Sequence, residues 1–466
     1  MSRKLDLFDL LPETILFLIV SYLPFKDAAK TSILSKRWRY IWHATTNIEF
    51  IESFFRRPHM LHGGGRESQK RAFINYVGKW MMQYQEPKVD RFRLSFSCPN
   101  EFHTDIEQWI RVVVNRNVEE LDLSFYWFGW EGRFPPYHAT LFDLPSCLYE
   151  HGTLQSLILA ACNLNDSMIK NFSSLKNLSL ECIRLKETFF VNMLPNCPSL
   201  ESLSLKRCVG LNEMNLEERT AMKLRKLCIC HCSPLRSTIK ISTPSLRFFK
   251  YSGSIQSLLL QHLTSIEEAD IDFGYAYVRT DEFRYLLCII LWHLHLAKCL
   301  IVCSYVPQVL HNRLLDFIPP PVPLEARHLI MKVGLQEREL PGILALLMYC
   351  PKLNTLTIKM GHVKFRDDGD PSVEFDFKAF CREREVGFQC LRENLKVIEV
   401  DLYQGMKSEE ELLRYLLKEA QVLERITITT CKEMDPDDAY PDLYFRNALR
   451  VRDFEKASHN LLVSIL

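Results

Sequence analysis

The chain has 466 residues and a formal net charge of +1, with 25% charged and 47% hydrophobic residues. This balance argues against a general electrostatic attraction to nucleic acid or to an anionic membrane surface. The 16 cysteines accompany an N-terminus without a secretory signal pattern, so we expect free thiols in a reducing compartment, the cytosol or the nucleus.

The first structured segment is expected at residues 5–45, where apolar residues crowd a short stretch. The sequence LPETILFLIVSYLPFKDAAKTSILSKRWRYIW, from Leu11 to Trp42, predicts three short helices, with Pro12 in the first turn of one and Pro24 at its end. A unit of about forty residues buries too little surface to cover all its large apolar side chains. We therefore expect an exposed apolar patch, and such patches mark binding sites.

Leucine-rich repeats are predicted after a loop at residues 51–70 and a first helix. The pattern L-x-x-L-x-L-x-x-C-x-L is complete in LQSLILAACNL, which begins at Leu154. Further copies begin at Val89, Val118, Leu175, Leu200, Leu224 and Leu246, and looser ones at Ile266, Ala297, Ala326, Leu353, Leu395 and Leu423. The copies from Leu154 to Leu246 begin roughly 20–25 residues apart, which is the spacing of leucine-rich repeats.

Each copy predicts one short strand and a turn. The last two leucines of L-x-x-L-x-L alternate with period two, so both point inward from a strand. Cys162, Cys208 and Cys232 occupy the next fixed position, where a small side chain suits the turn. Between strands, DIEQWIRVVVNRN has apolar residues at helical spacing. Such units stack to bury their apolar faces, so we expect a curved α/β solenoid with parallel strands on the concave face and helices outside.

The most apolar stretch of the chain, Leu286–Cys303, contains His293, His295 and Lys298. A membrane span needs about 20 clean apolar residues, so this stretch predicts a buried helix that leads into a strand. We expect no membrane contact. Nucleic-acid binding would require a basic stripe along the repeats, which their strands lack.

The N-terminal segment resembles an F-box. The matching features are Leu-Pro, aliphatic residues at helical spacing and the ending Ser-Lys-Arg-Trp-Arg-x-Ile-Trp. The resemblance implies binding to a Skp-type adaptor, which links F-box proteins to a cullin–RING ubiquitin ligase. The adaptor-binding residues expected from it are Leu11, Pro12, Ile15, Leu16, Ile19, Leu23, Trp38 and Trp42. An open alternative is that these helices only cap the first repeat.

A second resemblance lies near the C-terminal end. The segment Cys390–Thr430 predicts a strand, a glycine turn, an amphipathic helix and a strand, and it resembles the FBD domain of plant F-box proteins. F-box, leucine-rich repeats and FBD in this order resemble the plant F-box/FBD/LRR-repeat family. The expected boundaries are 5–50 for the F-box, 51–88 for a linker and the first array helix, 89–385 for the repeats, 386–435 for the FBD-like region and 436–466 for a C-terminal tail or cap.

Motifs for catalysis are absent or incomplete. HGGG at His62 is similar to the oxyanion loop of some lipases, but the sequence has no G-x-S-x-G motif and no phosphate- or dinucleotide-binding glycine motif. The acidic DDGD at Asp367 lacks the later glutamate of an EF-hand. CICHC at Cys228, with Cys299 and Cys303 as another pair, lacks the usual spacing of zinc ligands. We expect no enzyme activity, no metal and no cofactor.

Three functions remain open. The leading hypothesis is a substrate receptor of an SCF-type ubiquitin ligase. The alternative is an interaction scaffold that binds the adaptor or another protein without promoting ubiquitination, and a hydrolase using HGGG is the third. For a protein target, period two places alternate strand residues on the concave surface. The positions expected to contact it are Asn177, Glu181, Ser202, Ser204, Lys206, Lys226, Phe248 and Lys250.

Overall fold

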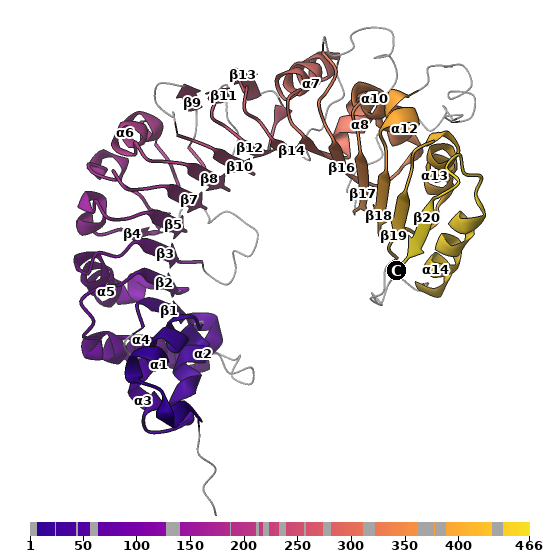
Figure 1. The fold of residues 1–466 in the computed structure, drawn as a ribbon. Coiled ribbons are helices and arrows are strands. Elements are labelled where there is room, and N and C mark those ends of the chain that lie inside the picture. Colours follow the sequence, from indigo (N-terminus) through magenta and orange to yellow (C-terminus); the bar gives the residue numbers. More distant parts are fainter. Residues whose placement is uncertain are drawn as a thin grey trace, which may run out of the picture. The chain divides into compact units, whose positions relative to one another are not determined.

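The computed structural model describes residues 7–23, 25–42, 45–55, 64–126, 140–186, 188–210, 214–217, 223–232, 239–255, 258–273, 281–310, 322–361, 377, 388–430 and 441–466. The chain divides into two compact units, Met1–Asn212 and Glu213–Leu466, which are taken one at a time. Figure 1 traces the elements along the chain.

The N-terminal segment is helical, as the sequence predicts. It comprises the 3-10 helix η1 (Leu7–Leu10), α1 (Glu13–Ser21), α2 (Phe25–Lys30), the 3-10 helix η2 (Thr31–Ile33) and α3 (Trp38–Ile41). Pro12 stands at the N-cap of α1 with a φ of −58°, and Glu13 occupies the first turn. Proline has no N–H to leave unpaired there, and the helix dipole favours the carboxylate. These two residues set the start of α1.

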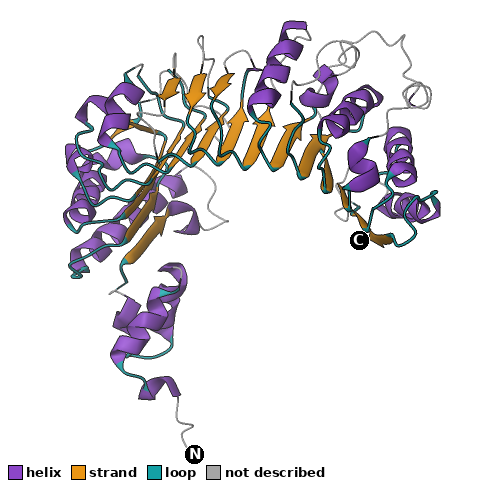
Figure 2. Ribbon diagram, turned by 45° about the horizontal axis from the view of Figure 1, so that its top comes forward, coloured by secondary structure: helices purple, strands orange, loops and turns teal. Residues whose placement is uncertain are grey.

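The first unit contains a parallel sheet in the order β1-β2-β3-β5-β7-β8. Its strands are β1 (Asn47–Ile51), β2 (Arg91–Ser95), β3 (Glu120–Ser124), β5 (Ser156–Ala160), β7 (Asn177–Glu181) and β8 (Ser202–Lys206), and β4 (Phe142–Asp143) pairs with β6 (Cys162–Asn163). The connecting helices are α4 (Gly64–Gln83), α5 (His103–Asn115) and α6 (Phe189–Asn196), with 3-10 helices η4 (Glu52–Phe55), η5 (Pro99–Phe102), η6 (Ser146–Glu150) and η7 (Asp166–Met168). The helices cover one side of the strands (Figure 2).

This sheet begins one strand earlier than the sequence indicates. β1 pairs in parallel with β2, from Asn47↔Arg91 onward, whereas the pattern predicts a first strand near residue 89. The reason is that β1 keeps the inward residues Ile48 and Phe50, both buried, but has Thr45 where the first leucine of the repeat would stand. The predicted loop at residues 51–70 is likewise too long, because α4 begins inside it.

The second unit contains a parallel sheet in the order β10-β12-β14-β15-β16-β17-β18-β19-β20. These strands are β10 (Lys226–Cys230), β12 (Phe248–Ser252), β14 (Glu268–Asp272), β15 (Cys299–Cys303), β16 (His328–Val333), β17 (Thr355–Met360), β18 (Val397–Asp401), β19 (Arg425–Ile428) and β20 (Leu462–Ile465). A smaller sheet, β13-β11-β9, contains β9 (Met214–Glu217), β11 (Ile239–Ser242) and β13 (Leu258–Gln261). The helices are α7 (Asp281–His293), α8 (Tyr305–Leu310), α10 (Leu340–Tyr349), α12 (Gln389–Glu393), α13 (Lys407–Glu419) and α14 (Pro441–Arg450), with the 3-10 helices η9 (Glu337–Glu339) and η10 (Val451–Asp453).

Two local predictions for the second unit are confirmed. The most apolar stretch of the chain forms the helix α7 followed by the strand β15. The segment that resembles FBD forms β18, a turn at Gly405 with a φ of +82°, α13 and β19. In addition, β20 pairs in parallel with β19, so the segment predicted as a tail or cap supplies a strand of the sheet.

Leucines at the two inward strand positions build the core. Neighbouring strands place them side by side, as in the register pairs Leu157↔Leu178 and Leu178↔Leu203. These side chains are at most 4% exposed, and burial of each contributes about 1.5–3 kcal/mol. The α/β leucine-rich-repeat architecture expected from the spacing is confirmed.

A left-handed residue follows many of the strands. Ala161, Cys182, Arg207 and His231, which directly follow β5, β7, β8 and β10, have φ between 49° and 55°. This conformation costs a non-glycine residue about 1–2 kcal/mol, so the sheet imposes it where the chain turns off a strand. The next residue then points inward, and both Cys162 and Cys208 are fully buried there.

The cysteines at the turn position are packing residues, as the sequence predicts. The Cys208 thiol donates a hydrogen bond to the carbonyl oxygen of Leu180 at 3.4 Å. Burial raises the pKa of the Cys162 thiol, which keeps it protonated and unreactive. Cys232, at the same position, is half-buried and its thiol contacts the carbonyl oxygen of Cys230.

Candidate functional site

The N-terminal helices expose large apolar side chains. This set, called the N-terminal patch, consists of Phe8, Leu10, Ile15, Phe17, Leu18, Tyr22, Ile33 and Leu34. Ile15, Leu18 and Tyr22 recur at helical spacing and so share one face of α1. Leu18 is 51% exposed and Tyr22 is 80% exposed. An apolar helix face left open in this way is a candidate interaction surface.

The residues predicted to bind an adaptor fall into two groups. Pro12 and Ile15 are exposed, and Leu11, Ile19 and Leu23 are half-buried. Leu16, Trp38 and Trp42 are at most 8% exposed, so the expectation that they form part of an open patch is wrong. The sequence signal that distinguishes these positions is helical spacing, which places Leu18 and Tyr22 on the opposite side of α1 from the buried Leu16.

Trp42 is buried because the first repeat covers it. Its ring lies 5.7 Å from that of Phe25 and 6.2 Å from that of Trp80 on α4, centroid to centroid. Phe25 also contacts Phe50 on β1 at 5.3 Å and Trp80 at 5.5 Å. These four side chains, called the aromatic cluster, join the N-terminal helices to the first strand and helix of the sheet. The two parts of this unit therefore share one core.

Trp38 and Arg37 hold the chain before α1 in place. The Trp38 ring packs edge-on against Phe8 at 5.8 Å. The Arg37 guanidinium donates hydrogen bonds to the carbonyl oxygens of Phe8, at 3.3 Å, and of Leu11. The end of the Ser-Lys-Arg-Trp motif thus positions the Leu-Pro start of α1, so part of the motif supports the patch from within.

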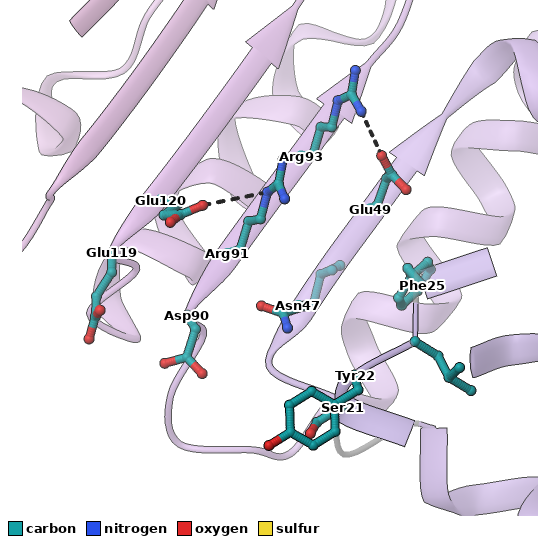
Figure 3. A pocket seen from close by; sticks show the side chains of 12 residues that line it. Ser21, Tyr22, Phe25, Asn47, Glu49, Asp90, Arg91, Arg93, Glu119 and Glu120 are labelled. Atoms are coloured by element: carbon teal, nitrogen blue, oxygen red, sulfur yellow. Dashed lines mark hydrogen bonds and ion pairs between the residues drawn. The ribbon is translucent and has the colours of Figure 1, made fainter. Parts of the chain in front are cut away.

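A hollow of about 510 Å³ lies between the end of α1 and the first three strands. It is lined by Ser21, Tyr22, Leu23, Phe25, Asn47, Ile48, Glu49, Asp90, Arg91, Arg93, Glu119 and Glu120. Figure 3 shows Tyr22 beside the hollow and the two arginines on β2. Arg93 pairs with Glu49 at 2.8 Å and with Asp122 at 3.0 Å. No motif in the sequence predicts a role for these strand residues.

Charges around the hollow compensate one another. Arg91 pairs with Glu120 at 3.7 Å (Figure 3). Lys88 lies 2.7 Å from Asp90 and 2.6 Å from Glu119. Burial raises the pKa of Asp122, although Arg93 acts in the opposite direction. The hollow is therefore a polar, internally paired surface that adjoins the N-terminal patch through Tyr22.

The predicted alignment of the proposed target-binding residues is confirmed for β7 with β8 in the first unit and for β10 with β12 in the second. In the first unit, Asn177 pairs with Ser202 and Glu181 with Lys206, with Ser179 and Ser204 between them. Asn177 and Lys206 are exposed and the others are half-buried. In the second unit, Lys226 pairs with Phe248 and Cys228 with Lys250. The two sets belong to different units, so each forms a surface of its own.

Side chains on the second of these faces are already paired with one another. The Lys226 ammonium lies 5.0 Å from the Phe248 ring centroid, and Phe248 is half-buried. Lys250 binds the buried carboxylate of Asp270 at 2.7 Å, and Lys332 binds the same carboxylate at 3.0 Å. This face thus presents lysines that are fixed by an internal acid, a connection that strand spacing does not reveal.

One acid of the FBD-like segment has a structural role. The Glu409 carboxylate accepts hydrogen bonds from the backbone N–H groups of Gln404, Gly405 and Met406, at 3.0, 2.7 and 3.2 Å. Burial raises the pKa of Glu409, while the N–H donors act in the opposite direction. A Cβ atom on Gly405 would come within 2.4 Å of Asn447. The turn before α13 therefore depends on both Glu409 and Gly405.

Several candidates from the sequence do not gather into a site. Within the described residues, no group of three His, Cys, Asp or Glu side chains is placed to hold a metal ion. Cys228 and Cys230 are buried on the strand face. His62 of HGGG and the DDGD segment at Asp367 lie outside the described residues. Among the helices that are described, none is long and apolar enough to cross a membrane.

Family comparisons assign the class of protein. The F-box domain model matches residues 8–46, and the model of the At1g61320/AtMIF1 LRR domain matches residues 81–447. Together with the helical N-terminal unit and the parallel repeat sheets, these matches show that the chain belongs to the plant F-box/LRR-repeat proteins. The repeat match runs through the FBD-like region, whose assignment as FBD stays a prediction.

Individual relatives extend over nearly the whole chain. The putative F-box/LRR-repeat protein At5g54820 of Arabidopsis thaliana is 30% identical and aligned over 94% of both chains. The putative F-box/LRR-repeat protein At1g56400 of the same plant is 28% identical over 90% of this chain and 87% of its own. The Arabidopsis F-box protein At3g62230 is 28% identical over 99% of both.

Proposed function

We propose that this chain is the substrate-recognition subunit of an SCF-type ubiquitin ligase. Its F-box binds a Skp-type adaptor, which connects it to the cullin–RING core, and its repeats bind a target protein. The observation that carries the proposal is the open apolar face of α1, formed by Ile15, Leu18 and Tyr22, within a segment that matches the F-box family. The protein acts by binding, in the cytoplasm or the nucleus, and makes no covalent bond itself.

The adaptor contact centres on the N-terminal patch. Burial of one large apolar side chain contributes about 1.5–3 kcal/mol, so a few such contacts give a stable complex. From the sequence-predicted set, Leu11, Pro12, Ile15, Ile19 and Leu23 are accessible wholly or in part. Leu16, Trp38 and Trp42 contribute indirectly, because they support the helices that carry the patch.

The shared core supports a mechanical role for the first unit. Ubiquitin transfer requires the target lysine to stay close to the ubiquitin donor, and fixed geometry raises the effective concentration of the reacting groups. The aromatic cluster packs Trp42 of the F-box directly against Trp80 of the first repeat helix. This packing fixes the F-box helices on the first repeats through side-chain contacts.

The target is proposed to contact the strand faces. In the first unit the candidates are Asn177, Glu181, Ser202, Ser204 and Lys206, and in the second unit they are Lys226, Phe248 and Lys250. These residues form mixed, mainly polar surfaces, which suit a protein ligand held by a few anchors. The variant with Phe248→Ala, Lys206→Glu and Lys226→Glu should lose target capture and keep adaptor binding. Full capture by this variant would move the target site elsewhere on the chain.

Adaptor binding is tested with Leu18→Asp. An aspartate at the centre of the patch should weaken binding to a purified Skp-type adaptor at least about tenfold in titration calorimetry, since it removes apolar contact and introduces a charge that must be desolvated. Val191→Asp on α6 is the matched control, because Val191 is 75% exposed but lies outside the F-box. Equal adaptor affinity for both variants would contradict the assignment.

The alternative is a scaffold that binds the same adaptor without promoting ubiquitination. The two functions differ in what the assembled complex does. Reconstitution with adaptor, cullin, RING protein and a target identified by co-purification should yield ubiquitin chains on that target with wild-type protein and not with Leu18→Asp. A complex that assembles fully but leaves the target unmodified would favour the scaffold.

A further inference from the structure

A lysine and a cysteine meet in the first unit, away from the N-terminal patch and from the strand faces. Lys70 lies on α4, and Cys98 is the N-cap residue of η5, which leads into α5. The Lys70 Nζ atom lies 2.9 Å from the Cys98 Sγ atom, although the two residues are 28 positions apart. This side-chain contact therefore joins two successive repeats, in addition to the backbone pairing of their strands β1 and β2.

The pair is shielded but reachable. The Lys70 side chain is only 16% exposed, and Cys98 is half-buried with a free thiol. Glu101 and Glu67 approach the same ammonium group at 3.6 and 3.8 Å. Burial acts to lower the pKa of Lys70, but the hydrogen bond and charge of Cys98, together with the two carboxylates, outweigh it and raise that pKa.

We propose that Lys70 and Cys98 form a reversible covalent crosslink when the protein is exposed to hydrogen peroxide. Peroxide first oxidises the thiolate, transferring one oxygen to Sγ to give a sulfenic acid while the second oxygen leaves as hydroxide. The neutral Lys70 amine then attacks Sγ, the S–O bond breaks, water leaves and an S–N bond forms. The balance is one thiol, one amine and one peroxide giving one sulfenamide and two waters.

The arrangement favours both steps. The thiolate is the form of a cysteine that reacts with peroxide, and the Lys70 ammonium group lies 2.9 Å from the Cys98 sulfur. Once Cys98 is a neutral sulfenic acid, its interaction with Lys70 no longer raises the pKa of that lysine. Burial then acts to release the lysine proton, which gives the neutral amine that the second step needs. The attacking nitrogen already stands within hydrogen-bond distance of the sulfur.

Other half-exposed thiols of the chain provide internal controls. Burial raises the pKa of Cys147. Burial, and then Glu268 and Asp270, raise the pKa of Cys299 to about 11. Burial thus disfavours the thiolate form of both cysteines, which should react slowly with peroxide. If crosslinking reflected only access to solvent, all three cysteines would be oxidised alike.

The test is peroxide titration of the full-length protein with mass spectrometry. We expect a loss of about 2 Da, a tryptic peptide from α4 joined to the peptide that contains Cys98, and release of both by a thiol reductant. A gain of about 14 Da on the same joined pair would still support the crosslink, because a second peroxide, itself reduced to water, would place one oxygen between nitrogen and sulfur. Cys98→Ser and Lys70→Arg should each abolish the joined peptide.

Two outcomes would overturn the crosslink. One is oxidation of wild-type Cys98 to sulfinic acid with no joined peptide at any peroxide concentration. The other is a joined product that contains a second cysteine in place of Lys70. Because the decisive product is measured in the wild-type chain, the conclusion stands even if a variant unfolds. Adaptor binding by the crosslinked protein is expected to be unchanged, so failure of this inference is distinct from failure of the proposed function.

Discussion

Trp42 offers a sharp test of how the F-box is built into this protein. The F-box resemblance assigns it to the adaptor-binding surface, whereas in the fold it is 8% exposed and packs against Phe25 and Trp80. Trp42→Ala should therefore act on the stability of the first unit. Truncating a buried tryptophan to alanine costs about 3–5 kcal/mol, and the two aromatic pairs, each contributing about 0.5–1.5 kcal/mol, form part of that loss.

This loss is large on the scale of a folded protein. A native domain is stable by about 5–15 kcal/mol, so a loss of about 3–5 kcal/mol in Trp42→Ala should remove at least about a fifth of that margin. The denaturant midpoint, followed by circular dichroism, should fall clearly. Trp42→Phe keeps an aromatic ring at this position of the aromatic cluster, so it should lower the denaturant midpoint much less. Leu18→Asp, at an exposed position, should change the free energy of unfolding by no more than about 0.5 kcal/mol.

Adaptor binding must be measured beside stability, at a temperature where every variant is folded. Leu18→Asp should lose adaptor affinity without losing stability, and Trp42→Ala should lose stability first. The reasoning would be refuted if Trp42→Ala left the free energy of unfolding within about 0.5 kcal/mol of wild type and still abolished adaptor binding. That result would place Trp42 in the contact surface and leave the aromatic cluster without a structural role.

Three further predictions concern the repeats. Cys162→Ser should be tolerated better in thermal melts than Cys162→Leu, because the turn position is fully buried and has no room for a larger side chain; equal melting of the two would show that the repeat register is wrong there. Asp166 accepts a hydrogen bond from Thr188 at 2.6 Å, and despite burial such contacts hold the pKa of Asp166 below its ordinary value. The stability contributed by the ionised Asp166 is thus fully present above about pH 4 and is lost as the pH falls through the lowered pKa. The difference in urea midpoint between wild type and Asp166→Asn should therefore shrink in acid. A difference that does not change with pH would contradict this. Leu402→Gly should raise the free energy of unfolding by up to about 1 kcal/mol, because Leu402 is exposed and its φ of 60° suits glycine better than leucine. The control is Leu443→Gly on α14, where the side chain is equally exposed. There glycine should lower the free energy of unfolding by about the same amount, because it is unfavourable inside a helix.

Local spacing was enough for the strands and helices because each repeat carries its own pattern. The paired leucines of β5, β7 and β8 specify strand, register and inward face together. The same holds for the FBD-like segment, where Gly405 and the apolar positions of α13 define the turn and the helix. Where the pattern lost one member, as at Thr45 before β1, the strand still formed because its neighbour supplies the hydrogen-bond partners.

The repeat and the helices of the F-box could be predicted because both follow from periods of two or 3.6 residues, and an exposed apolar patch because so small a unit cannot cover all its apolar side chains. Which of these side chains are exposed depends on the folded unit. Trp42 meets Trp80, and Lys70 meets Cys98, through folding of segments that are distant along the chain. Periodicity predicts which residues share a face of one helix or strand. Which other element covers that face depends on how the whole unit packs. For this reason the motif is enough to locate the F-box, whereas the fold is needed to distinguish its exposed residues from its core.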